Sequence, residues 1–180
     1  MAMEQEKINA AFWKKLDRYI KANYKPEEKK KAVLSTTDAS LGAGVGIIAA
    51  LNLSLPSMEA LRHRKEQTFA ERLLSLMNEK DLTPQEVYKK AGLTKALFSK
   101  IKKDVDYRPS KDTVICFIFA LHLEESEAND LMQRAGYSFS HSIIRDLIIQ
   151  FFIQQGVLDI DALEGALYDR HLKTLHEQVK

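Results

Sequence analysis

Outside the three consecutive lysines at 29–31, the densest group of side chains able to bind an anion lies at residues 89–103. This stretch holds six lysines and no acid: Lys89, Lys90, Lys95, Lys100, Lys102 and Lys103. Such a concentration of positive charge attracts polyanions, nucleic acid above all. A solvated helix face is the commoner explanation of a lysine cluster, so its meaning depends on the elements that carry it.

Charge is unevenly distributed along the chain, although the net charge is only +2. Residues 1–67 carry 12 Lys/Arg against 8 Asp/Glu, and residues 68–123 carry 10 against 7. Residues 124–170 carry 3 against 9. The N-terminal two thirds of the chain are therefore basic and residues 124–170 are acidic. We expect a polyanion to bind the basic part.

The histidines and serines that could bind a metal or act in catalysis lack the neighbouring residues that such a site needs. The five histidines are His63, His122, His141, His171 and His176. The last two are five residues apart and no cysteine or acid cluster joins them, which is poor spacing for zinc. Ser140 and Ser142 flank His141, but adjacent residues on a helix do not face each other, and we expect Ser140 to cap a helix. We expect no metal, no cofactor and no enzymatic activity.

Cys116, the only cysteine, lies between Ile115 and Phe117. No charged neighbour in the sequence lowers its pKa, so we expect an unreactive core thiol. One cysteine cannot form an internal disulfide, which favours an intracellular protein. Asp159 and Asp161 are typical of a helix cap and its first turn.

Glycines at residues 42–46 have a spacing that superficially resembles a phosphate-binding loop. A dinucleotide fingerprint also needs a preceding strand and a later acid, and a Walker loop needs a lysine; none is present. We expect a flexible connection running into a helix of small residues. A nucleotide-binding enzyme remains a remote alternative, which tight binding of a nucleotide would revive.

No membrane or export segment is expected. The first 15 residues are polar, unlike a signal peptide. The longest apolar stretch, residues 41–55, is interrupted by Asn52 and Ser54 and is shorter than the about 20 residues that a membrane helix needs. We expect a cytoplasmic protein.

The elements that position the lysines are predicted to be helices throughout, because glycine and proline are scarce. Residues 7–24 form an amphipathic pattern that ends before Pro26, and we expect this helix to pack on the core or on a second subunit. Residues 25–67 predict no clear element. The apolar positions of the first helix are Ile8, Phe12, Leu16, Tyr19 and Ile20.

Five helices are predicted between residues 68 and 135. Thr68, Thr83, Thr94 and Ser110 precede four of them as caps, Glu71 completes a capping box with Thr68, and Glu86 stands at the third position of the second helix. Pro84 stands at the first position of the second helix, and Gly92 ends it. The third helix spans residues 95–103, with Leu97, Phe98 and Ile101 facing inward. The fourth spans residues 113–123 and the fifth residues 124–135, and Gly136 stops the fifth.

Two further helical patterns follow, at residues 140–155 and 159–172. The expected organisation is an N-terminal helix with a connecting segment (residues 1–67), a five-helix domain (68–135) and a C-terminal helical extension (136–180). The expected fold class is all-α.

Four runs combine with this helix order: LTPQEVYKKAGL at 82–93, TKALFSKI at 94–101, RPS at 108–110 and FAL at 119–121. With these runs, residues 68–135 resemble the lambda-repressor-like (XRE) family of helix-turn-helix domains. Gly92 stands at the turn between the two key helices of that family. Residues 81–168 also resemble a recurrent bacterial C-terminal module that joins this domain to two extra helices.

The resemblance implies that helix 94–103 lies in the major groove of double-stranded DNA and reads it, with no cofactor. Arg108, in the following loop with Tyr107 and Lys111, either touches the nucleic-acid backbone or belongs to a loop that covers the core. The positions implied to approach bases and flanking phosphates are Thr94, Lys95, Ala96, Ser99 and Lys100. Those implied to attract phosphate without reading sequence are Lys89, Lys90, Lys102 and Lys103.

Two functions stay open. The first is a DNA-binding transcriptional regulator that forms a homodimer. The second is a protein-interaction module (an antitoxin, adaptor or regulatory subunit) that binds a partner through its C-terminal helices. Tyr88, where the family usually has a small residue, and Pro84, where it often has glutamine, favour the second. An exposed surface at residues 148–152 would also favour it.

Overall fold

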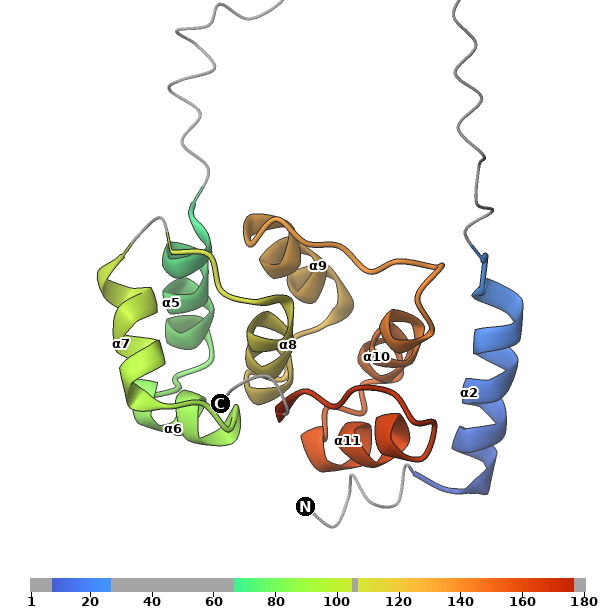
Figure 1. Cartoon of the computed structure of the whole chain (residues 1–180). Coiled ribbons are helices and arrows are strands. Elements are labelled where there is room, and N and C mark those ends of the chain that lie inside the picture. Colours follow the sequence, from blue (N-terminus) through green and yellow to red (C-terminus); the bar gives the residue numbers. More distant parts are fainter. Residues whose placement is uncertain (1–7, 27–66, 105–106, 177–180) are drawn as a thin grey trace, which may run out of the picture. The chain divides into compact units, whose positions relative to one another are not determined.

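The computed structural model describes residues 8–26, 67–104 and 107–176 (Figure 1). Within these ranges the regular structure consists of eight α-helices without a strand, so the all-α prediction is confirmed there. No helix in this part of the chain combines the length and apolar character needed to cross a membrane. The predictions for residues 42–46, residues 41–55 and His63 lie outside the described residues. The helices are α2 (Ala10–Asn23), α5 (Phe69–Glu79), α6 (Pro84–Lys90), α7 (Lys95–Lys103), α8 (Lys111–Ala120), α9 (Glu125–Arg134), α10 (Ile144–Gln154) and α11 (Ile160–Tyr168).

Short polar side chains begin most of these helices, because the first backbone N–H groups of a helix have no partner within it. Thr68 and Thr83 form capping boxes with the glutamates three residues later. Thr94, Ser110 and Asp159 each accept a backbone N–H of the first turn. The predicted caps at these five positions are confirmed.

Ser140 does not cap α10, so that prediction is wrong. The helix begins four residues later, at Ile144, and its N-cap residue makes no side-chain hydrogen bond. The Ser140 hydroxyl instead lies 2.8 Å from that of Ser142, and its backbone N–H donates to Asp146 at 2.8 Å. The carboxylate of Asp146, in the first turn of α10, therefore shapes this loop.

Six helices end with one residue in the left-handed region, which turns the chain back towards the core. In each case the next residue donates its N–H to a carbonyl five positions earlier, as Leu93 does to Tyr88 at 2.8 Å. The residues that follow the reversal are Leu82, Leu93, Leu123, Tyr137, Val157 and Leu172, of which Leu93, Leu123 and Val157 are buried and the other three are partly buried against the core. The left-handed residues are Asp81, Gly92, His122, Gly136, Gly156 and His171.

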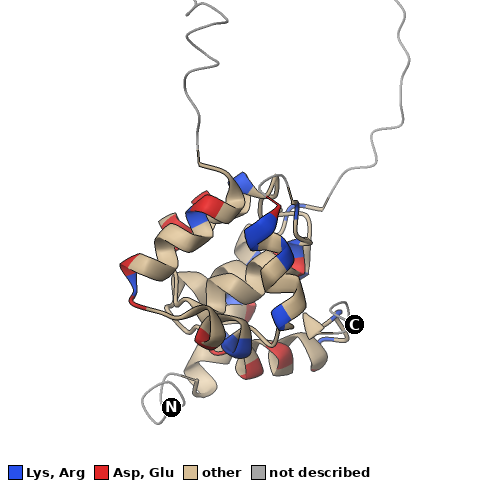
Figure 2. Ribbon diagram, turned by 90° about the vertical axis from the view of Figure 1, so that its left-hand side faces the viewer, with Lys and Arg blue, Asp and Glu red and all other residues tan. Residues whose placement is uncertain are grey.

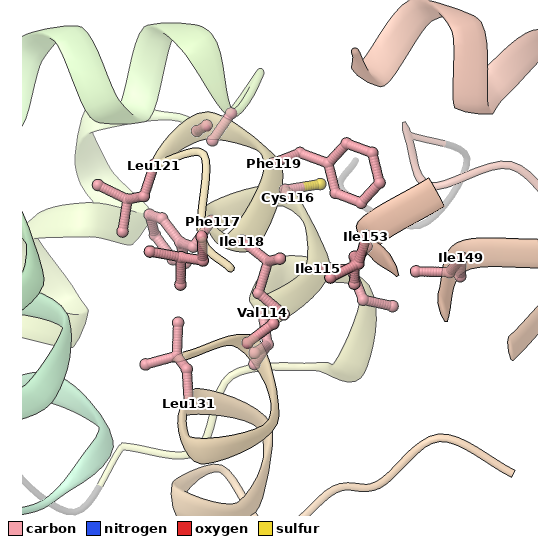
Figure 3. Close-up of a cluster of buried hydrophobic side chains, with 14 of the residues drawn as sticks. Val114, Ile115, Cys116, Phe117, Ile118, Phe119, Leu121, Leu131, Ile149 and Ile153 are labelled. Atoms are coloured by element: carbon pink, nitrogen blue, oxygen red, sulfur yellow. The ribbon is translucent and has the colours of Figure 1, made fainter. Parts of the chain in front are cut away.

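Helix α8 is the centre of the hydrophobic core. Every residue of it after Lys111 is buried, including the apolar run from Val114 to Ala120. Figure 3 shows its side chains pointing in several directions, with Leu131 of α9 and Ile149 and Ile153 of α10 among those around them. A helix that is apolar on all sides needs neighbours on all sides, and α6, α9 and α11 pack against this one.

The N-terminal helix α2 covers an apolar side of α10. The Phe12 ring lies with its centroid 5.2 Å from that of Phe151 and 5.1 Å from that of Phe152, and Tyr19 also contacts Phe151. Leu16 is fully buried. The sequence predicted that this helix packs either on the core or on a second subunit. In the structure it packs on the core of its own chain.

Candidate nucleic-acid interface

Helices α6 and α7 are joined by a four-residue turn at residues 91–94. Gly92 has φ of +64°, a conformation that residues with a side chain rarely adopt. Leu93 is buried next to it, and Thr94 begins α7 by accepting the Leu97 N–H at 3.2 Å. The turn therefore fixes where α7 starts, and α6 and α7 pack against each other.

Helix α7 has one buried face and one face in solvent. Phe98 and Ile101 are buried, and the Phe98 ring lies 6.2 Å from that of Phe117 in the central helix α8. Ser99 is half-buried. The residues exposed to solvent are Thr94, Lys95, Ala96, Lys100, Lys102 and Lys103. All of the predicted contact residues of this helix except Ser99 thus lie on its open surface.

Tyr88 is accommodated between α6 and α7. Its half-buried ring lies 6.2 Å from the Phe98 ring, at an interplanar angle of 49°. The large side chain fills space between the two helices and joins the core next to Phe98. A tyrosine at this position therefore coexists with the packing of α6 on α7.

The α7 lysines are not engaged in ion pairs with the residues that the structure describes, although Asp104 directly follows Lys103. Among the described residues, Lys95, Lys100, Lys102 and Lys103 form no ion pair, and α7 itself contains no acid. Figure 2 views the molecule from the side on which Figure 1 shows this helix, with Lys and Arg in blue. Positive charge that no neighbouring carboxylate offsets attracts a polyanion most effectively.

Lys100 is held in place by Tyr107. Its ammonium nitrogen lies 4.8 Å from the centre of the tyrosine ring, within the range of a cation–π contact. The ring is half-buried and packs against the core. Sequence reasoning considered this tyrosine as a loop residue only. An aromatic residue seven positions after a lysine gives no specific signal, because a loop separates the two.

The other two cations of that loop have different environments. Arg108 is exposed, as a phosphate contact requires. Lys111 donates to the carboxylate of Asp146 and, at 2.9 Å, to the carbonyl of Ser138. Its charge is therefore engaged within the protein.

Lys89 and Lys90 lie at the end of α6, where positive charge is favourable for the helix dipole. Both are exposed, but they line an open cleft of about 680 Å³ together with Asp159 and Asp161 of the α11 N-terminus. The two acids offset part of the positive potential at this edge. The charge of α7 is thus better placed for a polyanion than that of α6.

The structure also places the cysteine and histidines that the sequence analysis rejected as catalytic or metal-binding residues. Cys116 is fully buried, and this burial is the main cause that raises the pKa of its thiol to about 12. His176 lies 3.1 Å from the carboxylate of Glu164, whereas His141 is exposed. In the described ranges no three His, Cys, Asp or Glu side chains gather as metal ligands would.

Comparison with known protein families, curated proteins and solved structures finds no match to this chain. The case for a function therefore rests on the surface of α6 and α7 and on what lies around it.

Proposed function

We propose that this protein is a DNA-binding regulator in which α6 and α7 act as a helix-turn-helix and α7 enters the major groove. The observation that carries the proposal is the open face of α7, where four lysines are exposed and form no ion pair with any residue that the structure describes. The opposite face is anchored in the core through Phe98 and Ile101. A rigid helix with one free basic face is what groove binding requires.

The size and spacing of α7 agree with this role. Its nine residues make a rod about 13 Å long, and a helix with its side chains fits a groove about 12 Å wide. Lys95 and Ser99, like Ala96 and Lys100, are four residues apart and share a face. Lys95 and Lys100 would donate to guanine acceptors, and Ser99 to either kind of base edge.

The remaining cations would position the protein without reading sequence. Lys102, Lys103 and Arg108 are exposed beyond the base-reading positions and would neutralise phosphates. Lys89 and Lys90 would add a weaker attraction, because Asp159 and Asp161 share their cleft. Since one such module makes few base contacts, we propose that a homodimer binds a palindromic site.

The protein-interaction alternative receives no support from residues 148–152 of the C-terminal helices. That function would be favoured by an exposed surface at residues 148–152. Ile148, Ile149, Phe151 and Phe152 are all at most 1% exposed, and α2 contacts the two aromatic residues. We therefore advance DNA binding alone.

The test is binding to genomic and random-sequence duplex DNA across a salt series. The wild type is compared with a variant that removes the α7 lysines and with a control that removes four exposed lysines of the N-terminal region. The test variant is Lys95→Ala/Lys100→Ala/Lys102→Ala/Lys103→Ala, and the control is Lys14→Ala/Lys15→Ala/Lys21→Ala/Lys25→Ala. Both lose four positive charges, so net charge alone cannot separate them.

We expect the wild type to retain particular genomic sequences near physiological salt. The slope of log affinity against log salt should flatten in the α7 variant, by about 0.9 for each lysine that contacts a phosphate. The control should keep both its selectivity and its slope. Weak, sequence-indifferent binding that is equal in all three proteins would exclude the proposal and direct the search to protein partners.

A further inference from the structure

The segment that follows α11, residues 171–176, turns back along the molecule and is firmly held. His171 has φ of +54° and reverses the chain, and Leu172 donates its N–H to Leu167 at 2.9 Å. Leu175 is fully buried in the common core. The segment is thus part of the folded structure.

Two helices anchor this segment through polar side chains. One carboxylate oxygen of Glu164 in α11 accepts the N–H of Leu175 at 2.8 Å and the N–H of His176 at 3.3 Å. The same oxygen lies 3.1 Å from Nδ1 of the His176 ring. Arg145 of α10 donates to the carbonyl of Lys173 at 2.8 Å. The orientation of the histidine ring is therefore determined by Glu164.

The held ring lies against the turn between α6 and α7. A Cβ atom added to Gly92 would meet Nε2 of His176 at 2.3 Å and Cδ2 at 3.0 Å. Real Cβ contacts are not this short, so the ring occupies the space that any side chain at position 92 would need. Gly136 and Gly156, which also have positive φ, have nothing within 4 Å of such an atom. The ring contact is thus specific to the Gly92 turn.

We propose that His176 is a positioning residue for α7, acting through its contact with Gly92. Glycine has the most backbone freedom of any residue, and this one stands two residues before Thr94, where α7 begins. A ring fixed by Glu164 against that backbone removes conformations in which α7 starts at another angle. This inference rests on the proposed function for its consequence in DNA binding, and on the contact alone for its consequence in the turn.

The experiment measures amide hydrogen exchange by NMR and DNA affinity in the full chain, with any tag at the N-terminus. His176→Ala removes the ring, and His141→Ala is the matched control because that histidine is exposed. The reporting amides are those of Leu93 and Phe98, which bond to Tyr88 and Thr94. Those of α8 report on the whole fold.

We expect exchange at Leu93 and Phe98 to rise about tenfold in His176→Ala while α8 is unchanged, since the opening is local. Selective DNA affinity should fall by about fivefold or more. His141→Ala should change neither. Glu164→Ala should reproduce the effect, and the double variant should add little to it, because both side chains act through one contact.

Three results would overturn the inference. Unchanged exchange at Leu93 and Phe98 would show that the ring does not hold the turn. Exchange that rises equally in α8 would show that His176 only stabilises the whole fold. Increased exchange with unaltered DNA affinity would show that the turn does not position α7 for reading. If the wild type itself shows no selective DNA binding, the proposed function fails, whereas the exchange data still decide the role of His176 in the turn.

Discussion

Arg145 of α10 donates to Asp112 of α8 at 2.7 Å, and both side chains are nearly enclosed, with 16% and 7% of their surfaces exposed. The neighbouring residues form a second ion pair with the charges exchanged between the helices. In it, Lys111 of α8 donates to Asp146 of α10. Two ion pairs, one Lys–Asp and one Arg–Asp, thus join the first turn of α8 to the first turn of α10. Carboxylates can be buried here because each one faces a cation.

Removing one partner of this cluster should be costly. We expect Arg145→Met to lower the free energy of unfolding by about 3 kcal/mol, because Asp112 stays buried without its guanidinium. Urea denaturation measures the change. Asp17→Asn is the comparison: it removes a pair with Arg170 in which the carboxylate is 59% exposed, and should cost less than about 1 kcal/mol. Equal costs for the two variants would contradict this assignment.

The thiol of Cys116 should be inert in the folded protein. Burial in α8 raises its pKa to about 12, so very little thiolate exists at neutral pH, and reagents cannot reach it. We expect a disulfide reagent to label one thiol per chain in denaturant and none in buffer over the same period. Rapid labelling of the native protein would mean that α8 is more accessible than its full burial indicates.

Detaching α2 should expose the apolar side of α10. Phe12→Ala/Leu16→Ala removes the two buried side chains of α2. The only tryptophan, Trp13, lies with its ring 6.4 Å from that of Phe152 and serves as the probe. We expect its emission to shift to longer wavelength and a hydrophobic dye to bind. Lys14→Ala, an exposed change on the same helix, should cause neither. An unshifted emission in the double variant would show that these two side chains do not hold α2.

The carboxylate of Glu86 should report on the cap of α6 through its pH titration. Hydrogen bonds from the Thr83 hydroxyl and backbone N–H lower the pKa of Glu86. The stabilisation from this contact is therefore complete above the ordinary value of 4.5 and is lost as the pH falls through the lower folded-state pKa. We expect Thr83→Ala to raise the pKa of Glu86 and Thr83→Ser to leave it lowered, as measured by carboxyl NMR. The same pKa in both variants would rule out the hydroxyl as the main cause.

The local sequence determined where most helices begin, whereas the helices predicted to end at residues 123 and 172 end at Ala120 and Tyr168. Thr83 and Thr94 were predicted as caps, and the helix predicted at residues 95–103 has the bounds of α7. These predictions succeed because a cap joins residues three positions apart, so the side chains that decide it are visible in the sequence. Ser140 was the exception among the predicted caps. Its partner is Asp146, which in turn binds Lys111, thirty-five residues earlier in the chain.

Only the tertiary structure decided which surfaces are available. Periodicity shows that a helix has an apolar face, but it does not show what covers that face. Phe151 and Phe152 are buried, and α2, more than a hundred residues earlier in the chain, packs its Phe12 ring against both of them. For the same reason the sequence could not show that Lys111 is engaged while the lysines of α7 remain open, or that His176 lies on Gly92. Contacts between residues far apart in the chain depend on how the helices pack, and that packing is settled by the whole core at once.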